Sequence, residues 1–99
     1  IEDLDEYLYH VDRMLQNMKR NDYFKKVKGI IVGSMRDMHD NEIPFGQNEV
    51  QLITEIVKDL NIPIAFEFCA GHQKDNRTLM LGSHVDFEVN ETEIKLTFE

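Results

Sequence analysis

The first fifth of the chain carries apolar residues at the spacing of an amphipathic helix. After Leu4, the apolar positions follow at steps of four and three: Leu8, Val11, Leu15 and Met18. Side chains at these steps share one face of a helix, so we predict a helix over residues 5–20. Asp3 or Asp5 is expected to cap its start. The positive charges of Lys19 and Arg20 suit its carboxyl end.

Two apolar runs, within residues 28–33 and 63–68, show no alternation between apolar and polar positions. Such runs are typical of strands that are covered on both faces, commonly parallel ones. Between them, residues 48–60 carry a helical stripe that we expect to be buried: Ile53, Ile56, Val57 and Leu60. Asn61 and Pro63 should end this second helix.

The last part of the chain alternates between apolar and polar residues. Val85, Phe87 and Val89 are followed, after a polar turn at 90–93, by Ile94, Leu96 and Phe98. This pattern predicts an antiparallel hairpin over 84–98 with one face in water. Residues 34–47 form a long polar connection. The whole order predicts a single α/β domain over 1–99, with a small, mainly parallel sheet, covering helices and the hairpin.

Composition and charge narrow the function classes. The 99 residues are 41% hydrophobic and carry a formal net charge of −8. Phosphate contacts need clustered Lys and Arg, so the charge argues against nucleic acid, and equally against an anionic membrane surface. No apolar run approaches the roughly 20 residues that cross a bilayer.

The chain has a single cysteine, Cys69, so no internal disulfide can form. This favours a reducing compartment. The first residues, beginning at Ile1, already read as the end of one element and the start of another. We therefore expect a piece of a longer protein.

His72 is the first candidate for chemistry. It follows Gly71 in a loop just past the apolar run at 63–68. Glycine permits unusual backbone angles, and a loop held by a rigid strand end suits a general base. The alternative is a loop histidine that only bonds to nearby backbone.

Glu2 is the second candidate. An acid this close to a helix start is favoured by the helix dipole, which would make it structural. The functional alternative is the acid that orients the histidine of a Ser-His-acid triad. Glu2 and His72 would then be two triad members without a nucleophile.

No residue of this chain makes a convincing nucleophile. Ser34 follows a predicted strand but lacks the Gly-x-Ser-x-Gly turn that would expose its hydroxyl. Ser83 falls in a predicted tight turn. Cys69 lies three residues before His72, where the two rarely align as nucleophile and base, and it suits a small buried position.

The remaining polar residues leave two questions. The four histidines form no His-x-x-x-His pair and there is no pair of cysteines, so we predict no metal and no other cofactor. Residues 38–42 are rich in ligand atoms but also read as an ordinary polar loop.

Arg77 either ties its loop together with Asp75, or binds a substrate carboxylate through its forked guanidinium.

Three segments in this order carry a family resemblance. They are Ile1-Glu2-Asp3 with Tyr9-His10-Val11-Asp12-Arg13-Met14-Leu15; Val27-Lys28-Gly29-Ile30-Ile31-Val32-Gly33-Ser34; and Ile62-Pro63-Ile64-Ala65 through Ala70-Gly71-His72 and Asn76-Arg77-Thr78-Leu79-Met80-Leu81-Gly82. Together they resemble the C-terminal domain of LD-carboxypeptidases. These are serine peptidases that include muramoyltetrapeptide carboxypeptidases and microcin C immunity proteins. Cys69 stands where the family more often has Pro, and His10 where Arg is common.

The resemblance implies a swivelling β/β/α-type domain in which Glu2 is the triad acid and His72 the base. It implies that the nucleophilic serine lies in a preceding flavodoxin-like N-terminal domain that this chain lacks, so the chain alone should be inactive. It also implies hydrolysis of the amide to a terminal D-amino acid in murein peptides, for peptidoglycan recycling in the cytoplasm. The implied partners are that domain, the murein peptide and, in a homodimer, a second copy.

Two alternatives stay open. One is self-immunity to a peptide–nucleotide antibiotic, which uses the same chemistry on another substrate. The other is a non-catalytic α/β binding domain whose Gly-His loop is only structural. If a partner domain is missing, apolar surface should be exposed near Leu4, the 71–72 loop and residues 35–47.

Overall fold

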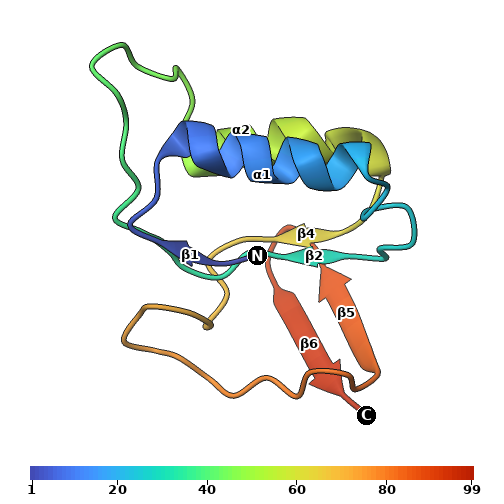
Figure 1. Ribbon diagram of the computed structural model, residues 1–99. Helices are drawn as coiled ribbons and strands as arrows, with labels where there is room; N and C mark the ends of the chain where they lie inside the picture. The colour runs from blue at the N-terminus through green and yellow to red at the C-terminus, as the bar shows by residue number, and fades with distance from the viewer.

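Short parallel strands lie beneath two helices in the computed structural model, which describes residues 1–99 (Figure 1). The strand β1 (Asp3–Leu4) pairs with β3 (Met35–Arg36), and β2 (Ile30–Ile31) pairs with β4 (Ile64–Ala65). Both pairs are parallel. The structure thus confirms the parallel arrangement predicted from the two apolar runs, in strands shorter than those runs.

Residues 30–36 form the central line of this parallel layer. On one side, Ile30 N donates to Pro63 O at 2.9 Å and Val32 N donates to Ala65 O at 2.8 Å. On the other side, Gly33 N donates to Ile1 O at 2.8 Å. The start of the chain and the segment after residue 63 therefore flank the same central segment.

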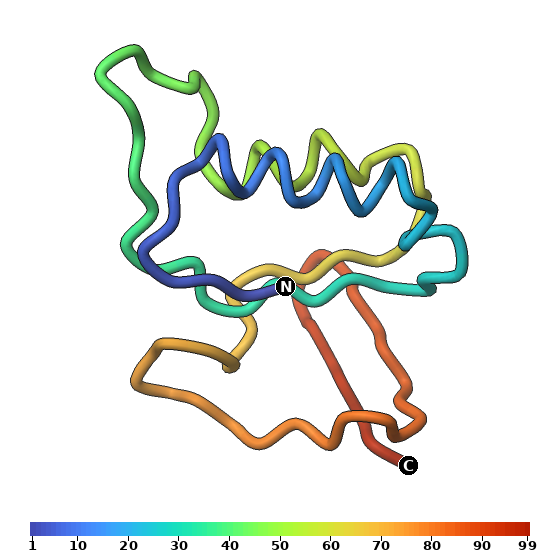
Figure 2. The backbone as a smooth tube through the Cα atoms, viewed as in Figure 1, coloured from blue at the N-terminus to red at the C-terminus, as the bar shows by residue number.

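The helices α1 (Leu8–Arg20) and α2 (Glu49–Val57) lie side by side over one face of the strands (Figures 1 and 2). A short 3₁₀ turn, η1 (Lys58–Leu60), extends α2. One apolar cluster joins helices and strands: Leu8, Val11, Leu15, Phe24, Ile30, Val32, Leu52, Ile53, Ile56 and Val57. Full burial of one such side chain contributes about 1.5–3 kcal/mol, so this cluster holds the two layers together.

The first helix begins later than its pattern predicts. Residues before Leu8 are not helical: β1 pairs with β3, Asp5 is left-handed with φ 56°, and Tyr7 forms a bridge with His39. Tyr7 occupies the cap position without a side-chain hydrogen bond. The prediction that Asp3 or Asp5 caps this helix is therefore wrong, because strand pairing holds both residues outside it.

The second helix agrees with its prediction. Asn48 caps it: its side chain accepts from Gln51 N at 2.9 Å, and the Gln51 side chain accepts from Asn48 N at 3.0 Å. This reciprocal pair satisfies two backbone donors at the helix start. At the other end, Asn61 takes a left-handed conformation with φ 52°, which stops the helix.

The C-terminal hairpin is also confirmed. The strands β5 (Val85–Val89) and β6 (Ile94–Phe98) pair antiparallel. Asn90 Oδ1 closes the turn by accepting from Thr92 N and Glu93 N. The hairpin lies on the side of the strands opposite the helices (Figure 1). It comes close at Gly29, where a Cβ would lie 2.6 Å from a ring carbon of Phe87.

Two long loops extend from the same end of the molecule (Figure 2). One connects β3 to α2, and the other connects β4 to β5 and carries Gly71 and His72. The long polar connection predicted over 34–47 contains a two-residue strand near its start, where Met35 and Arg36 form β3. None of the helices is long and apolar enough to span a membrane.

Candidate active site

Folding brings Glu2 and His72 together across 70 positions of sequence. His72 Nδ1 lies 2.6 Å from Glu2 Oε1. A carboxylate can only accept, so Nδ1 carries the proton and donates it. The pair has the separation expected of a histidine and the acid that orients it.

The end of the central strand segment holds both partners in place. Gly33 N donates to Ile1 O at 2.8 Å, and Asp3 N donates to Ser34 O at 3.3 Å, which fixes the backbone on both sides of Glu2. Ser34 N donates to Ala70 O at 2.9 Å, which fixes the loop just before His72. Residues 33–34 therefore join the acid-bearing segment to the base-bearing loop.

Gly71 makes the close approach of these segments feasible. Its φ is 109°, a conformation that residues with a Cβ rarely adopt. A Cβ at this position would collide with the Glu2 side chain and lie 2.5 Å from Ser34 Oγ. The glycine before His72 is thus required both by its backbone angle and by the space that Glu2 occupies.

Hydrogen bonds within the loop that carries His72 hold its conformation. Gly71 N donates to Asn76 Oδ1 at 3.1 Å, and Gln73 Nε2 donates to Phe68 O at 2.8 Å. Arg77 N donates to Cys69 O at 2.8 Å. These bonds order the loop without using the His72 ring.

The outward nitrogen of His72 is free. The only hydrogen bond of the ring goes through Nδ1 to Glu2, and the side chain is 58% exposed. Nε2 is therefore available to take a proton from a group outside this chain. The pair has the chemistry of a general base with its orienting carboxylate.

Arg77 lies further along the same loop and is engaged by Asp75. Its Nε and Nη2 donate to the two Asp75 oxygens at 3.0 and 2.9 Å. The hydrogen bonds from Arg77 lower the pKa of Asp75, and Asp75 in turn raises the pKa of Arg77. This two-pronged pair ties the loop, and binding of a substrate carboxylate by Arg77 stays a prediction.

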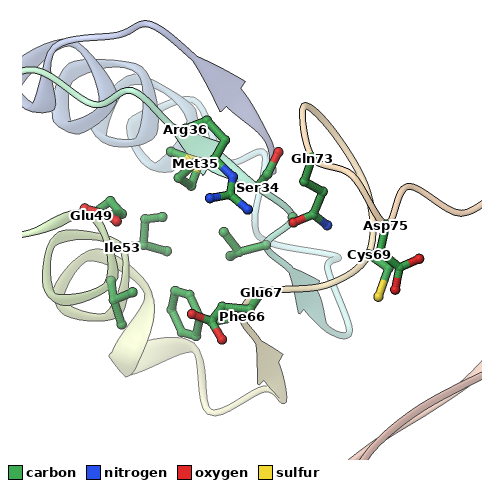
Figure 3. A pocket seen from close by; sticks show the side chains of 13 residues that line it. Ser34, Met35, Arg36, Glu49, Ile53, Phe66, Glu67, Cys69, Gln73 and Asp75 are labelled. Atoms are coloured by element: carbon green, nitrogen blue, oxygen red, sulfur yellow. The ribbon is translucent and has the colours of Figure 1, made fainter.

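A cleft of about 440 Å³ opens beside the site, between the end of the central strand, the start of α2 and the 66–75 loop. Figure 3 shows the Arg36 guanidinium reaching into it beside Ser34, with the Gln73 amide opposite. Glu49 and Glu67 also line it. Charged groups of both signs therefore surround this space.

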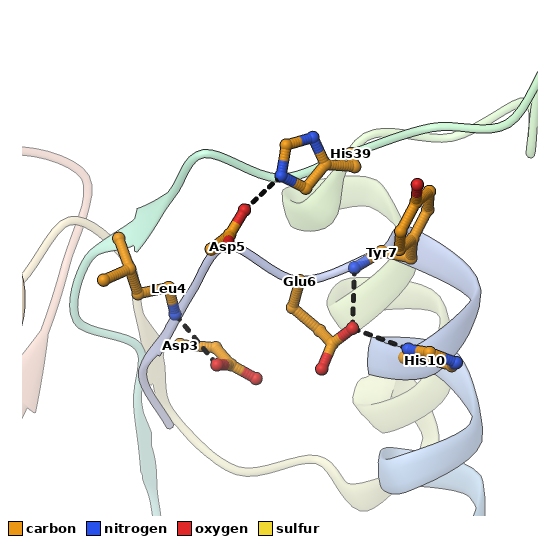
Figure 4. Close-up of polar contacts among 7 residues, drawn as sticks. All are labelled: Asp3, Leu4, Asp5, Glu6, Tyr7, His10 and His39. Atoms are coloured by element: carbon orange, nitrogen blue, oxygen red, sulfur yellow. Dashed lines mark hydrogen bonds and ion pairs between the residues drawn. The ribbon is translucent and has the colours of Figure 1, made fainter.

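Two other histidines form separate pairs with acids. His10 bonds to Glu6, and His39 bonds to Asp5 (Figure 4). The hydrogen bond from His10 is the main cause of the lowered pKa of Glu6. No three His, Cys, Asp or Glu side chains are arranged to hold a metal ion.

Neither serine considered as a nucleophile bonds to His72. Ser34 is buried, at 5% exposure, and its Oγ has no hydrogen-bond partner. Ser83 lies in the turn before β5. The sequence suggested Ser34 only as a possible nucleophile. It did not predict that Ser34 lies between Glu2 and Gly71, because the pairing of β1 with β3 leaves no periodic pattern in the sequence.

Comparisons with known proteins show the family and the fold. Residues 1–87 match the family model of the LD-carboxypeptidase C-terminal domain. The structure is similar to the crystal structure of muramoyltetrapeptide carboxypeptidase from Oxalobacter formigenes, with a TM-score of 0.85 and 26% sequence identity. That match covers 98% of this chain and 34% of the other, so this chain spans about a third of that protein's length. The chain belongs to the LD-carboxypeptidase C-terminal domain family.

Proposed function

We propose that this chain supplies the acid and the base of a serine LD-carboxypeptidase. In this proposal the full-length protein hydrolyses the amide to a terminal D-amino acid in murein peptides. The observation that carries the proposal is the Glu2–His72 hydrogen bond at 2.6 Å with His72 Nε2 left free.

The chemistry follows from these two side chains. A serine of the preceding domain attacks the scissile carbonyl while its proton moves to His72 Nε2. The Nδ1 proton stays in the hydrogen bond to Glu2, whose negative charge stabilises the imidazolium. The Nε2 proton then passes to the leaving D-amino acid amine, and the acyl-enzyme remains. Water then attacks the acyl-enzyme while His72 takes its proton. His72 returns this proton to the serine oxygen, and the carboxylate product is released.

Partners and location follow from the same proposal. The preceding domain contributes the nucleophile, and the substrate binds between the two domains. Recycling of murein peptides places the enzyme in the cytoplasm, and a homodimer is the proposed assembly. The single Cys69 fits a reducing compartment.

Activity of the full-length protein tests the proposal. On an LD-tetrapeptide, His72→Ala should lower kcat by about 10³-fold or more, and Glu2→Gln by about 10²–10⁴-fold, as for other triads. His84→Ala is the matched control, because His84 is exposed and makes only a backbone bond, to Glu99 N. Undiminished hydrolysis by His72→Ala would overturn the proposal. Hydrolysis of a peptide–nucleotide amide in place of the tetrapeptide would indicate the immunity reaction.

Arg77 is proposed to bind the terminal carboxylate of the substrate. Its guanidinium is already oriented by Asp75, so its remaining N–H groups are held in one direction. Arg77→Ala should then raise KM about tenfold or more with a smaller effect on kcat, measured by steady-state kinetics. Arg20→Ala, at the end of α1, serves as a control. An unchanged KM in Arg77→Ala would limit Arg77 to its role in tying the loop.

A further inference from the structure

Ser34 is the one polar residue in the buried set of this protein. Its Oγ is also the only fully buried side-chain nitrogen or oxygen without a hydrogen-bond partner. Leaving a buried hydroxyl unbonded destabilises a fold, so such a group calls for a reason. A serine that only filled space would serve better as alanine.

The position of Ser34 relates it to the acid–base pair. Its backbone N donates to Ala70 O and its O accepts from Asp3 N, so it lies between the neighbours of His72 and of Glu2. Ser34 Oγ and the Glu2 carboxyl carbon lie 2.5 and 2.8 Å from the point where a Gly71 Cβ would stand. The hydroxyl and the carboxyl group of Glu2 therefore both lie next to the space that a Gly71 Cβ would fill.

The Glu2 carboxylate has room for a second donor. Its hydrogen bond from His72 goes to Oε1, and Oε2 makes none. Resting on the proposed function, we propose that Ser34 is a positioning residue for Glu2. Its hydroxyl donates to Oε2 and fixes the carboxylate while His72 carries the proton. Because Gly71 has no side chain, no Cβ occupies the space beside the two groups.

The test uses the full-length protein with Ser34→Ala, and Ser83→Ala as the matched control in an exposed turn. Three readouts are measured: kcat and KM on an LD-tetrapeptide, the melting temperature, and the Nδ1–H signal of His72 in ¹⁵N-histidine-labelled protein. A hydrogen bond to a charged group is lost, so Ser34→Ala should lower kcat about tenfold or more at unchanged KM. The melting temperature should fall, because the same hydrogen bond is lost from the fold, and the Nδ1 proton should exchange faster with water. Ser83→Ala should leave all three as in the wild type.

Two results would overturn the proposal. Ser34→Ala with wild-type kcat and a wild-type Nδ1–H signal would make the hydroxyl an unused group. A joint fall in kcat and melting temperature with an unchanged Nδ1–H signal would make Ser34 purely structural. The failure of the proposed function looks different, since the wild-type protein would then not hydrolyse the tetrapeptide. In that case the exchange of the His72 Nδ1 proton alone decides the role of Ser34.

Discussion

Gly71 shows how a single residue couples backbone geometry to the candidate chemistry. Its positive φ turns the loop so that His72 meets Glu2, and its missing Cβ leaves the space that the Glu2 side chain fills. The sequence alone indicated a glycine suited to a special angle. The collision with Glu2 could not be foreseen, because it depends on a residue at the far end of the chain.

Replacing Gly71 should therefore harm activity by more than backbone strain. Gly71→Ala puts a methyl group into Glu2 and Ser34, and we expect kcat of the full-length protein to fall by about 10²-fold or more. Gly46→Ala is the matched control: Gly46 also has a positive φ, of 91°, but nothing lies within 4 Å of its Cβ position. Similar kcat values for both variants would show that the contact with Glu2 and Ser34 does not affect catalysis.

At the scale of elements, periodic patterns in the sequence predicted the helices and the hairpin but not the pairing of the shortest strands. Both helices were foreseen because their buried faces repeat along the sequence, and the hairpin because its apolar residues alternate with polar ones. The strands β1 and β3 are two residues each, too short for a periodic signal. Their pairing is what delays α1 and carries Glu2 to the site. Glu2 and His72 were candidates from their local sequence, but their roles as triad acid and base rested on family resemblance, since no local pattern connects two residues so far apart in the chain.

The ends of the two helices are joined by Lys19. Its Nζ donates to Ile56 O at 2.6 Å and to Asp59 Oδ1 at 2.9 Å. Lys19→Met loses the bond to Ile56 O, worth about 1 kcal/mol. For a domain of this size, that should lower the melting temperature by about 4–8 °C. Lys58→Met is the control, because Lys58 bonds only to the exposed Glu55 one turn away. Equal melting temperatures for the two variants would contradict this account.

The Lys19 contact also predicts a pH dependence. The hydrogen bond from Lys19 lowers the pKa of Asp59. A carboxyl with a lowered folded-state pKa contributes stability above its unfolded pKa, about 3.9, and loses it as the pH falls through the folded value. The stability difference between wild type and Lys19→Met should therefore shrink from pH 7 to pH 3 in urea titrations. A difference that grew on acidification would have the wrong sign.

Across the whole molecule, apolar side chains are exposed near the site and on both long loops. Leu81 is 92% exposed and Ile43 86%, with Met80 at 52% and Leu4 at 37%. The sequence predicted such exposure around Leu4, the 71–72 loop and the 35–47 loop as the mark of a missing partner. The size and position of this exposed apolar surface could not be predicted from the sequence, because exposure depends on which faces the hairpin and helices cover.

Hydrogen exchange can identify what covers this surface. We expect backbone amides around Ile43 and Leu81 to exchange more slowly in the full-length protein than in the 99-residue chain, if the proposed preceding domain packs on them. Amides of the β5–β6 turn at 90–93 serve as an internal control and should not change. Slowing that depends on protein concentration would point to a second copy instead. Equal exchange in both proteins would contradict a covered surface.

The central claim is that Glu2 and His72 act as one unit in the full-length enzyme. A double-mutant cycle measures this most directly, through kcat/KM of the wild type, Glu2→Gln, His72→Ala and the combined variant on an LD-tetrapeptide. Residues that act as a unit are strongly non-additive. The combined variant should therefore be no slower than His72→Ala alone. Losses that multiply in the combined variant would contradict the account, because they would mean that the two side chains act independently.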